Sequence, residues 1–232
     1  MRLALWVMLA ALAVPPAAAQ TIITADYARP VSRYGHDALG PGHEWGALEV
    51  QLHDGRRLRF SLPETLVYED IAPRLADLTG DGLPEVLVVE SSLTQGSRLA
   101  VYSSKGRMAA TAFIGARNRW LAPVGVADLD GDGTVELVYI ETPHLAKVLK
   151  VVHLSGATLT PVAELAGLTN HHLGSAAIES AILSCGSSAV VLVADADWGQ
   201  VMAVRLVQGN LVATPFRPYT GPESFANLPI CN

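Results

Sequence analysis

One acidic segment occurs twice in this sequence, fifty-one residues apart, and this repeat constrains the fold more than any other feature. The first copy reads ADLTGDGLPEVLVVE over residues 76–90, and the second reads ADLDGDGTVELVYIE over residues 127–141. Eight of these fifteen positions are identical, and each copy runs from an acidic turn into an apolar, strand-like segment. A repeat of about 40–50 residues with strand-like content is typical of β-propeller blades.

The rhythm of apolar segments extends beyond the two clear copies. The second copy predicts four strands, at residues 124–128, 135–141, 147–153 and 158–165. A degenerate third copy lacks the acidic loop but keeps two strand-like segments, at residues 178–183 and 189–194. Ahead of the first copy, residues 44–52 and 57–62 flank the turn sequence HDGR and predict a hairpin.

These patterns predict an all-β chain: a β-propeller-like stack of about four four-stranded antiparallel blades. The clear copies cover about residues 72–115 and 122–166, and the degenerate copy covers about residues 174–215. A four-bladed ring is the favoured arrangement. A five-bladed ring or an open stack of blades remains possible, because the first unit is hard to complete from the sequence.

Composition limits the classes of partner. Half of the residues are hydrophobic, 16% are charged, and the formal net charge is −6. This hydrophobicity excludes an intrinsically disordered chain. The charge leaves no basic excess to neutralise phosphates, so nucleic acid is not an expected partner.

The first nineteen residues have the pattern of a signal peptide. Arg2 precedes an apolar run at residues 3–14, and three alanines at residues 17–19 provide a cleavage site near Ala19-Gln20. The alternative is a short membrane anchor, although the run is short for a bilayer span. We therefore expect a periplasmic or secreted protein, with residues 20–232 as one domain and no later transmembrane segment.

Two cysteines, Cys185 and Cys231, remain after signal removal. An exported chain meets an oxidising compartment, so one structural disulfide between them is expected. It would close a loop of roughly 45 residues and contribute on the order of 3–4 kcal/mol to stability. Two free buried thiols are the alternative.

The acidic loops have the residue types of a calcium site. Acidic or hydroxyl side chains alternate with other residues, and glycines permit the tight curvature that turns the alternate positions inward. The expected ligands are Asp77, Thr79, Asp81, the carbonyl of Leu83 and Glu85 in the first loop, and Asp128, Asp130, Asp132, the carbonyl of Thr134 and Glu136 in the second.

An EF-hand is excluded, because the twelfth loop positions are Val88 and Tyr139 rather than glutamate. Metal-free turns are the alternative, since Asp and Gly also favour turns. One or two Ca²⁺ ions, with a role in stability, are therefore expected.

With these motifs, the chain resembles the FG-GAP, or VCBS-type, repeats of integrin α-subunit propellers and of many exported bacterial proteins. The resemblance is carried by the pattern Asp-x-Asp-x-Asp-Gly-x-x-Glu at residues 128–136, and more weakly by residues 77–85, where Thr79 replaces an acid. It implies a β-propeller with structural calcium. It implies little about ligand or reaction, because one fold serves many functions.

Two equivalent triplets should lie side by side on the face opposite the acidic loops. They are Asn118, Arg119 and Trp120, and Asn170, His171 and His172. Such a rim could bind an anionic or sugar-like ligand, and the resemblance to integrin propellers implies that partners dock there. The alternative is that Trp120 covers a hydrophobic blade junction and the asparagines make turns. A further acidic segment, residues 195–199, is predicted to be a turn between the second and third strands of its blade.

The sequence contains no nucleophile elbow, phosphate-binding loop or zinc-protease pattern. We therefore expect an exported, calcium-stabilised binding module for a protein or carbohydrate partner. The alternatives are a periplasmic hydrolase that uses the His/Arg rim, and a purely structural scaffold.

Overall fold

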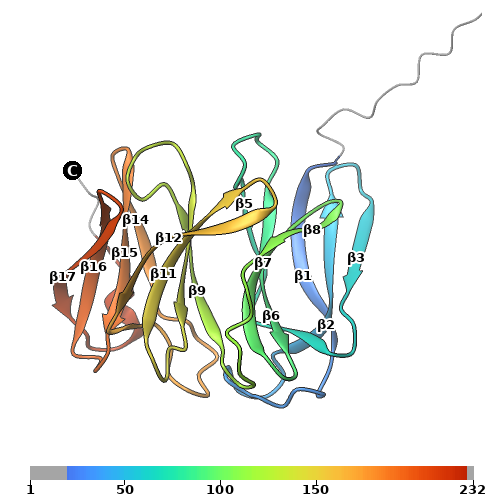
Figure 1. The fold of residues 1–232 in the computed structure, drawn as a ribbon, viewed down its shortest axis with the longest axis horizontal. Coiled ribbons are helices and arrows are strands. Elements are labelled where there is room, and N and C mark those ends of the chain that lie inside the picture. The colour runs from blue at the N-terminus through green and yellow to red at the C-terminus, as the bar shows by residue number, and fades with distance from the viewer. Residues whose placement is uncertain (1–19, 229–232) are drawn as a thin grey trace, which may run out of the picture.

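The structure is a computed structural model that describes residues 20–228, and in this range the regular secondary structure is almost entirely β-strand (Figure 1). The strands are β1 Ile22–Pro30, β2 Glu44–Leu52, β3 Arg57–Ser61, β4 Leu66–Glu69, β5 Arg74–Ala76, β6 Glu85–Ser92, β7 Gly96–Ser103, β8 Gly106–Ala110, β9 Leu121–Ala127, β10 Glu136–Glu141, β11 Val148–Ser155, β12 Thr158–Ala166, β13 Leu168–Thr169, β14 Ala181–Cys185, β15 Ser188–Asp195, β16 Gln200–Val207 and β17 Asn210–Pro218. A short 3-10 helix, η2, covers Pro222–Phe225. The predicted all-β fold is confirmed.

The strands form three antiparallel sheets that correspond to four successive units. The first sheet has eight strands in the order β1-β2-β4-β6-β7-β8, with β3 on β2 and β5 on β6. The second sheet has the order β12-β11-β10-β9, and the third has the order β13-β15-β16-β17 with β14 on β15. We call β1–β4 the first unit, β5–β8 the second, β9–β12 the third and β13–β17 the fourth. The third unit is a four-stranded antiparallel blade of the predicted kind.

The short strand β4 joins the first and second units into one sheet. It pairs with β2 at Trp45↔Tyr68 and with β6 at Val67↔Ser91. The sequence analysis did not predict this strand, because it has four residues and no counterpart in the repeat. The first two units are therefore coupled by strand pairing as well as by side-chain packing.

Alternating side chains bury both faces of the interior strands. On β6, Val86 and Val88 pack with the first unit, whereas Leu87 and Val89 pack with the third. On β10, Val138 and Ile140 pack with the fourth unit. Each junction between neighbouring units is thus a hydrophobic core, as in stacked propeller blades.

The four units lie in an open row, with β1–β3 at one end of the long axis and β15–β17 at the other (Figure 1). A four-bladed ring would bring these ends together, so the ring favoured from the sequence is not formed by residues 20–228. The open stack is the observed arrangement.

The two ends of the stack have different outer surfaces. Polar side chains that include Asp26, Glu49 and Arg57 line the outer side of the first unit. Phe225 and Leu228 of the C-terminal segment pack on the outer face of the fourth unit. Terminal repeats need such faces, because no further repeat buries them.

Most predicted strands are confirmed. The hairpin at residues 44–52 and 57–62 corresponds to β2 and β3, and the four strands of the second copy correspond to β9–β12 within three residues. The predicted signal peptide at residues 1–19, and Cys231, lie outside the described residues. Within residues 20–228, no helix combines the length and apolar character needed to cross a lipid bilayer.

Candidate metal loops and linker face

The two acidic segments form equivalent loops between the first and second strands of neighbouring units. The loop at residues 77–84 joins β5 to β6, and the loop at residues 128–135 joins β9 to β10. The Asp77 carboxylate accepts hydrogen bonds from the backbone N–H groups of Gly80 and Gly82, at 2.8 Å each. Asp128 accepts the matching bonds from residues 131 and 133, at 2.7 and 2.9 Å. The repeated sequence therefore folds the same way twice.

Four loop glycines make this curl possible. Gly80, Gly82, Gly131 and Gly133 have φ between 74° and 89°, in the left-handed region that other residues rarely adopt. The curl points the backbone N–H groups at the first aspartate of each loop.

The last acid of each loop holds the loop against its strand. Glu85 Oε2 accepts a hydrogen bond from the Leu78 N–H at 2.9 Å, and Glu136 Oε2 accepts one from the Leu129 N–H at 2.8 Å. Both glutamates are buried. Burial raises the pKa of Glu136, the Leu129 N–H lowers it, and the charges of the loop aspartates raise it further. The loop thus gathers the aspartate carboxylates around Glu136, whose side chain is largely shielded from water.

A divalent cation site requires several oxygen ligands close together, and the second loop provides them better than the first. Side-chain oxygens of Asp128, Asp130 and Glu136 lie within 4.8 Å of one another, and this is the one such group of three among the described residues. In the first loop Thr79 occupies the position of Asp130. Hard oxygen donors so close together fit Ca²⁺. The Asp132 side chain instead accepts a hydrogen bond from the Thr134 N–H at 2.6 Å.

The opposite face, which we call the linker face, is built from the linkers between units and the loops between second and third strands. The two triplets singled out in the sequence meet there. The Trp120 ring lies 4.8 Å from the His171 ring and 6.4 Å from the His144 ring, between centroids. Trp120 Nε1 also donates a hydrogen bond to the Glu69 carbonyl at 2.9 Å. Trp120, which precedes β9, therefore contacts the first unit through Glu69 and the segment between β13 and β14 through His171.

Three of the six predicted rim residues are buried and cannot contact a ligand on the surface. Trp120 is 2% exposed, His171 1% and Asn170 0%. The reason is that the segment between β13 and β14 packs the His171 ring edge-on against the Trp120 indole. Asn118, Arg119 and His172 are exposed. The alternative interpretation, in which Trp120 covers a blade junction, matches this arrangement.

The buried histidines form a directed hydrogen-bonded chain. His171 Nε2 lies 2.8 Å from the Ser175 carbonyl, so this nitrogen must carry the proton. His171 Nδ1 is then an acceptor, and His144 Nε2, 2.8 Å away, is the donor. Burial lowers the pKa of His144 to about 4, with His171 acting in the same direction, and burial also lowers the pKa of His171. Both rings are therefore neutral at pH 7.

This pair should make the protein less stable in mild acid. An unfolded histidine titrates near pH 6.5, whereas folded His144 titrates near 4. Between these values the unfolded chain binds more protons, so the free energy of unfolding falls as the pH falls. Because the ring is only half-buried, we expect a loss of about 1 kcal/mol from pH 7 to pH 4.5. Urea melts of the wild type and His144→Gln should converge at low pH. Parallel stability curves for the two proteins would contradict the assignment.

A half-buried aromatic group, which the sequence analysis missed, lies beside this chain. The His172 ring stacks on Trp198 with 3.7 Å between centroids, and Tyr219 lies 4.8 Å from Trp198. The Tyr219 hydroxyl donates to buried Glu179 at 2.8 Å. Trp198 belongs to the turn at residues 195–199, which the sequence identified only as an acidic turn. The sequence signal that could have identified this aromatic group was the tryptophan within a short turn.

The backbone holds Trp198 in an unusual conformation. Its φ is 58°, which is uncommon for a bulky residue. The Asp195 carboxylate accepts a hydrogen bond from the Gly199 N–H at 2.7 Å, and Lys147 Nζ donates to the Ala196 carbonyl. Strained positions that the surroundings enforce occur often at functional surfaces.

Two exposed leucines extend the apolar surface of the linker face. Leu173, next to His172, is 70% exposed, and Leu145, next to His144, is 58% exposed. We call Leu145, His172, Leu173, Trp198 and Tyr219 the linker-face patch. It combines aliphatic and aromatic side chains from the third and fourth units and the linker between them.

A family model described as an FG-GAP-like repeat matches residues 77–139. This stretch starts at the first residue of the first acidic loop and ends within β10, so it contains both acidic loops. The predicted FG-GAP-type repeat is confirmed for this part of the chain.

Among solved structures, the exotype rhamnogalacturonan lyase YesX is similar to the chain, with a TM-score of 0.47 and 16% sequence identity. The similarity covers 70% of this chain and 35% of the lyase chain. No function is transferred from it. No curated protein matches the chain in sequence.

Proposed function

We propose that the protein is an exported, calcium-stabilised β-propeller-like binding module whose partner is a protein that docks on the linker-face patch. The exposure of Leu145 and of Leu173, which follows His172 in the sequence, together with the stacking of His172 on Trp198, carries this proposal. Contiguous exposed apolar surface marks interaction sites, and tryptophan and tyrosine are enriched at interface hot spots. A carbohydrate would use the aromatic rings but would gain little from the two leucines. The hydrolase alternative loses support, because two members of its rim, Trp120 and His171, are buried.

Calcium would act in this module by stabilising the acidic loops. The clustered oxygens of Asp128, Asp130 and Glu136 support this proposal for the second loop. The matching backbone bonds at Asp77 support a second, weaker site in the first loop. A cation would offset the repulsion among the carboxylates. It would thereby fix the start of β6 and β10, the strands that bury both of their faces.

Partner capture from the native envelope fraction tests the docking surface. The double variant Trp198→Ala/Leu173→Ser should lower the amount of the captured partner at least tenfold, because hot-spot residues each contribute about 2 kcal/mol or more. Val207→Ser is the matched control, since Val207 is 47% exposed and lies at the β16–β17 turn. Undiminished capture by the double variant would contradict the proposed surface. Capture of the wild type that is abolished by a soluble polysaccharide would favour a carbohydrate partner.

Export and a disulfide between Cys185 and Cys231 remain part of the proposal. Cys185 and Leu228, which lies three residues before Cys231, both pack against the outer hydrophobic cluster of the fourth unit. A disulfide there would fasten the C-terminal segment over the end of the stack. We expect reductant to lower the free energy of unfolding by about 3 kcal/mol. Cys231→Ser should remove this response. Peptide mapping without reduction that finds both thiols free would contradict the pairing.

A further inference from the structure

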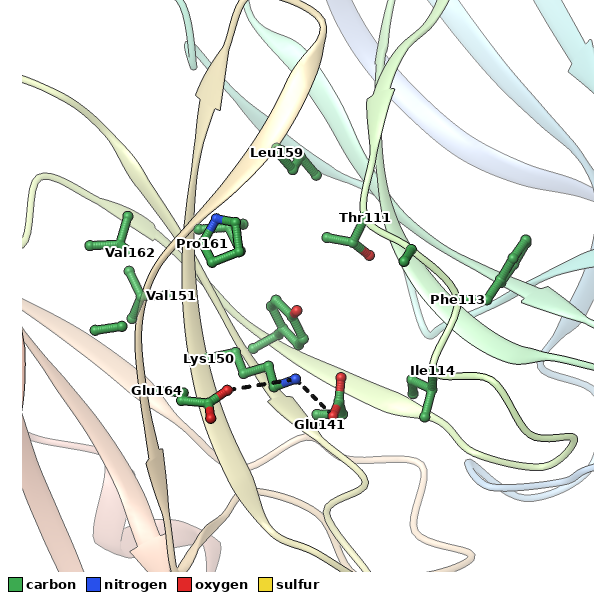
Figure 2. A pocket seen from close by; sticks show the side chains of 14 residues that line it. Thr111, Phe113, Ile114, Glu141, Lys150, Val151, Leu159, Pro161, Val162 and Glu164 are labelled. Atoms are coloured by element: carbon green, nitrogen blue, oxygen red, sulfur yellow. Dashed lines mark ion pairs between the residues drawn. The ribbon is translucent and has the colours of Figure 1, made fainter.

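A cavity of about 520 Å³ opens between the second and third units (Figure 2). One wall is the segment that follows β8, with Thr111 and Ile114, and the other comes from β10, β11 and β12. Figure 2 shows Leu159 and Pro161 near one end and Lys150, Glu141 and Glu164 together at the other. This volume lies within the range of about 300–1,000 Å³ found for small-molecule sites.

The cavity exists because the two units differ in length at this edge. Strand β8 has five residues, whereas β12 has nine. After Ala110 the chain keeps single backbone bonds to β7, from the N–H groups of Thr111 and Ile114, and then leaves the sheet. Part of the face of β10–β12 is therefore left without a covering strand. The opening is a consequence of the backbone and not of one mobile side chain.

The polar end of the cavity carries a net negative charge. Lys150 Nζ lies 2.9 Å from Glu141 Oε1 and 3.8 Å from Glu164 Oε2. The single ammonium thus faces two carboxylates. The Glu164 side chain is 69% exposed and makes the longer contact, so its oxygens are the more available acceptors. Arg98, which lies over the Phe113 ring, pairs with Glu90 at 2.8 Å, and Arg107 shares the same carboxylate.

A hydroxyl group on the cavity wall lacks a protein partner. Tyr139 is 4% exposed, lines the cavity and pairs with Lys150 across the strands, and its hydroxyl makes no hydrogen bond to any described residue. The hydroxyl oxygen of Tyr139 is not fully buried. Because Tyr139 lines the cavity, this oxygen is open to it. Burial raises the pKa of Tyr139, as do the charges of Glu141 and Glu164. The hydroxyl therefore stays neutral, and its oxygen can accept a hydrogen bond.

We propose that this cavity binds a small organic cation with an apolar body and one ammonium head. The apolar walls would take the body, and the head would pair with Glu164 and Glu141. A carboxylate head would meet two like charges and one lysine that is already paired. A sugar would find two aromatic rings, but the Tyr139 side chain is buried at the strand, Arg98 lies over the Phe113 ring, and the remaining walls are mostly aliphatic. The proposal shares no residue with the linker-face patch and does not rest on the proposed function.

Three probes of equal chain length test the charge and the apolar body separately. Hexylammonium, hexanol and hexanoate are titrated into the full mature protein while amide chemical shifts are followed by NMR. We expect hexylammonium to bind with a dissociation constant on the order of 1 mM, a reasonable value for about seven heavy atoms. Hexanol should bind more weakly, and hexanoate at least tenfold more weakly than hexylammonium. The largest shifts should fall on residues 111–114 and on β11 and β12.

Two variants with opposite charge effects complete the test. Glu164→Gln, at an exposed position, should weaken hexylammonium binding five- to tenfold. Lys150→Met should strengthen it severalfold, because both carboxylates lose their competing cation. Equal affinities for all three probes, shifts elsewhere in the protein, or hexanoate binding that Lys150→Met abolishes would overturn the proposal.

Discussion

Removal of calcium is expected to lower the melting temperature of the protein that starts at residue 20 by roughly 5–10 °C for each occupied loop. An ion that binds only the folded state adds about 2.7 kcal/mol when its free concentration is ~100 times the dissociation constant. For a domain of this length, 1 kcal/mol corresponds to about 2–4 °C. The loss should appear when metal-free protein is compared by calorimetry with protein in millimolar calcium. Magnesium should restore little, because it prefers a smaller and more rigid octahedral shell.

Substitutions in the two loops should separate their contributions. Asp130→Ala removes one member of the three-carboxylate group and should abolish the response of the second loop. Thr79→Asp introduces the acid that the first loop lacks and should increase its response. Asp197→Asn removes an exposed acid outside both loops and serves as the control. An unchanged calcium response in Asp130→Ala would show that the ion stabilises the protein elsewhere.

Trp120→Ala should cost about 3–5 kcal/mol of folding free energy. The indole is 2% exposed, belongs to the core between the second and third units, and donates a hydrogen bond to the Glu69 carbonyl. Truncation would leave a large cavity and an unpaired buried carbonyl. Trp120→Phe should cost about 1–2 kcal/mol, because the ring packing largely remains.

Trp198→Ala is the matched control for this measurement. Trp198 is only half-buried and lies in a surface turn, so its truncation should cost about 1 kcal/mol or less. Urea unfolding measures all three variants under one condition. A cost below 1 kcal/mol for Trp120→Ala would mean that the junction is not held together by this side chain.

The strands could be predicted where the local pattern was strong. Residues 136–141 alternate between two buried faces and follow an acidic turn, and the hairpin of β2 and β3 surrounds a turn sequence with glycine. The loop conformations could also be predicted, because Gly131 and Gly133 permit positive φ. These features depend on residues close together in the sequence.

Features that depend on contacts between distant segments could not be predicted. The strand β4 exists because β2 and β6 both pair with it. The burial of His171 depends on where the segment between β13 and β14 runs, and the stacking of Trp198 on His172 depends on the packing of the fourth unit. Likewise, the open row follows from the angles between neighbouring sheets, which no local pattern specifies.

The central claim is that the two repeated acidic loops bind calcium. Isothermal titration calorimetry tests it most directly, with calcium titrated into metal-stripped protein that starts at residue 20. The expected result is one or two ions bound per chain, with one fewer in Asp130→Ala. Absence of any binding heat and of any bound metal after dialysis against millimolar calcium would contradict it.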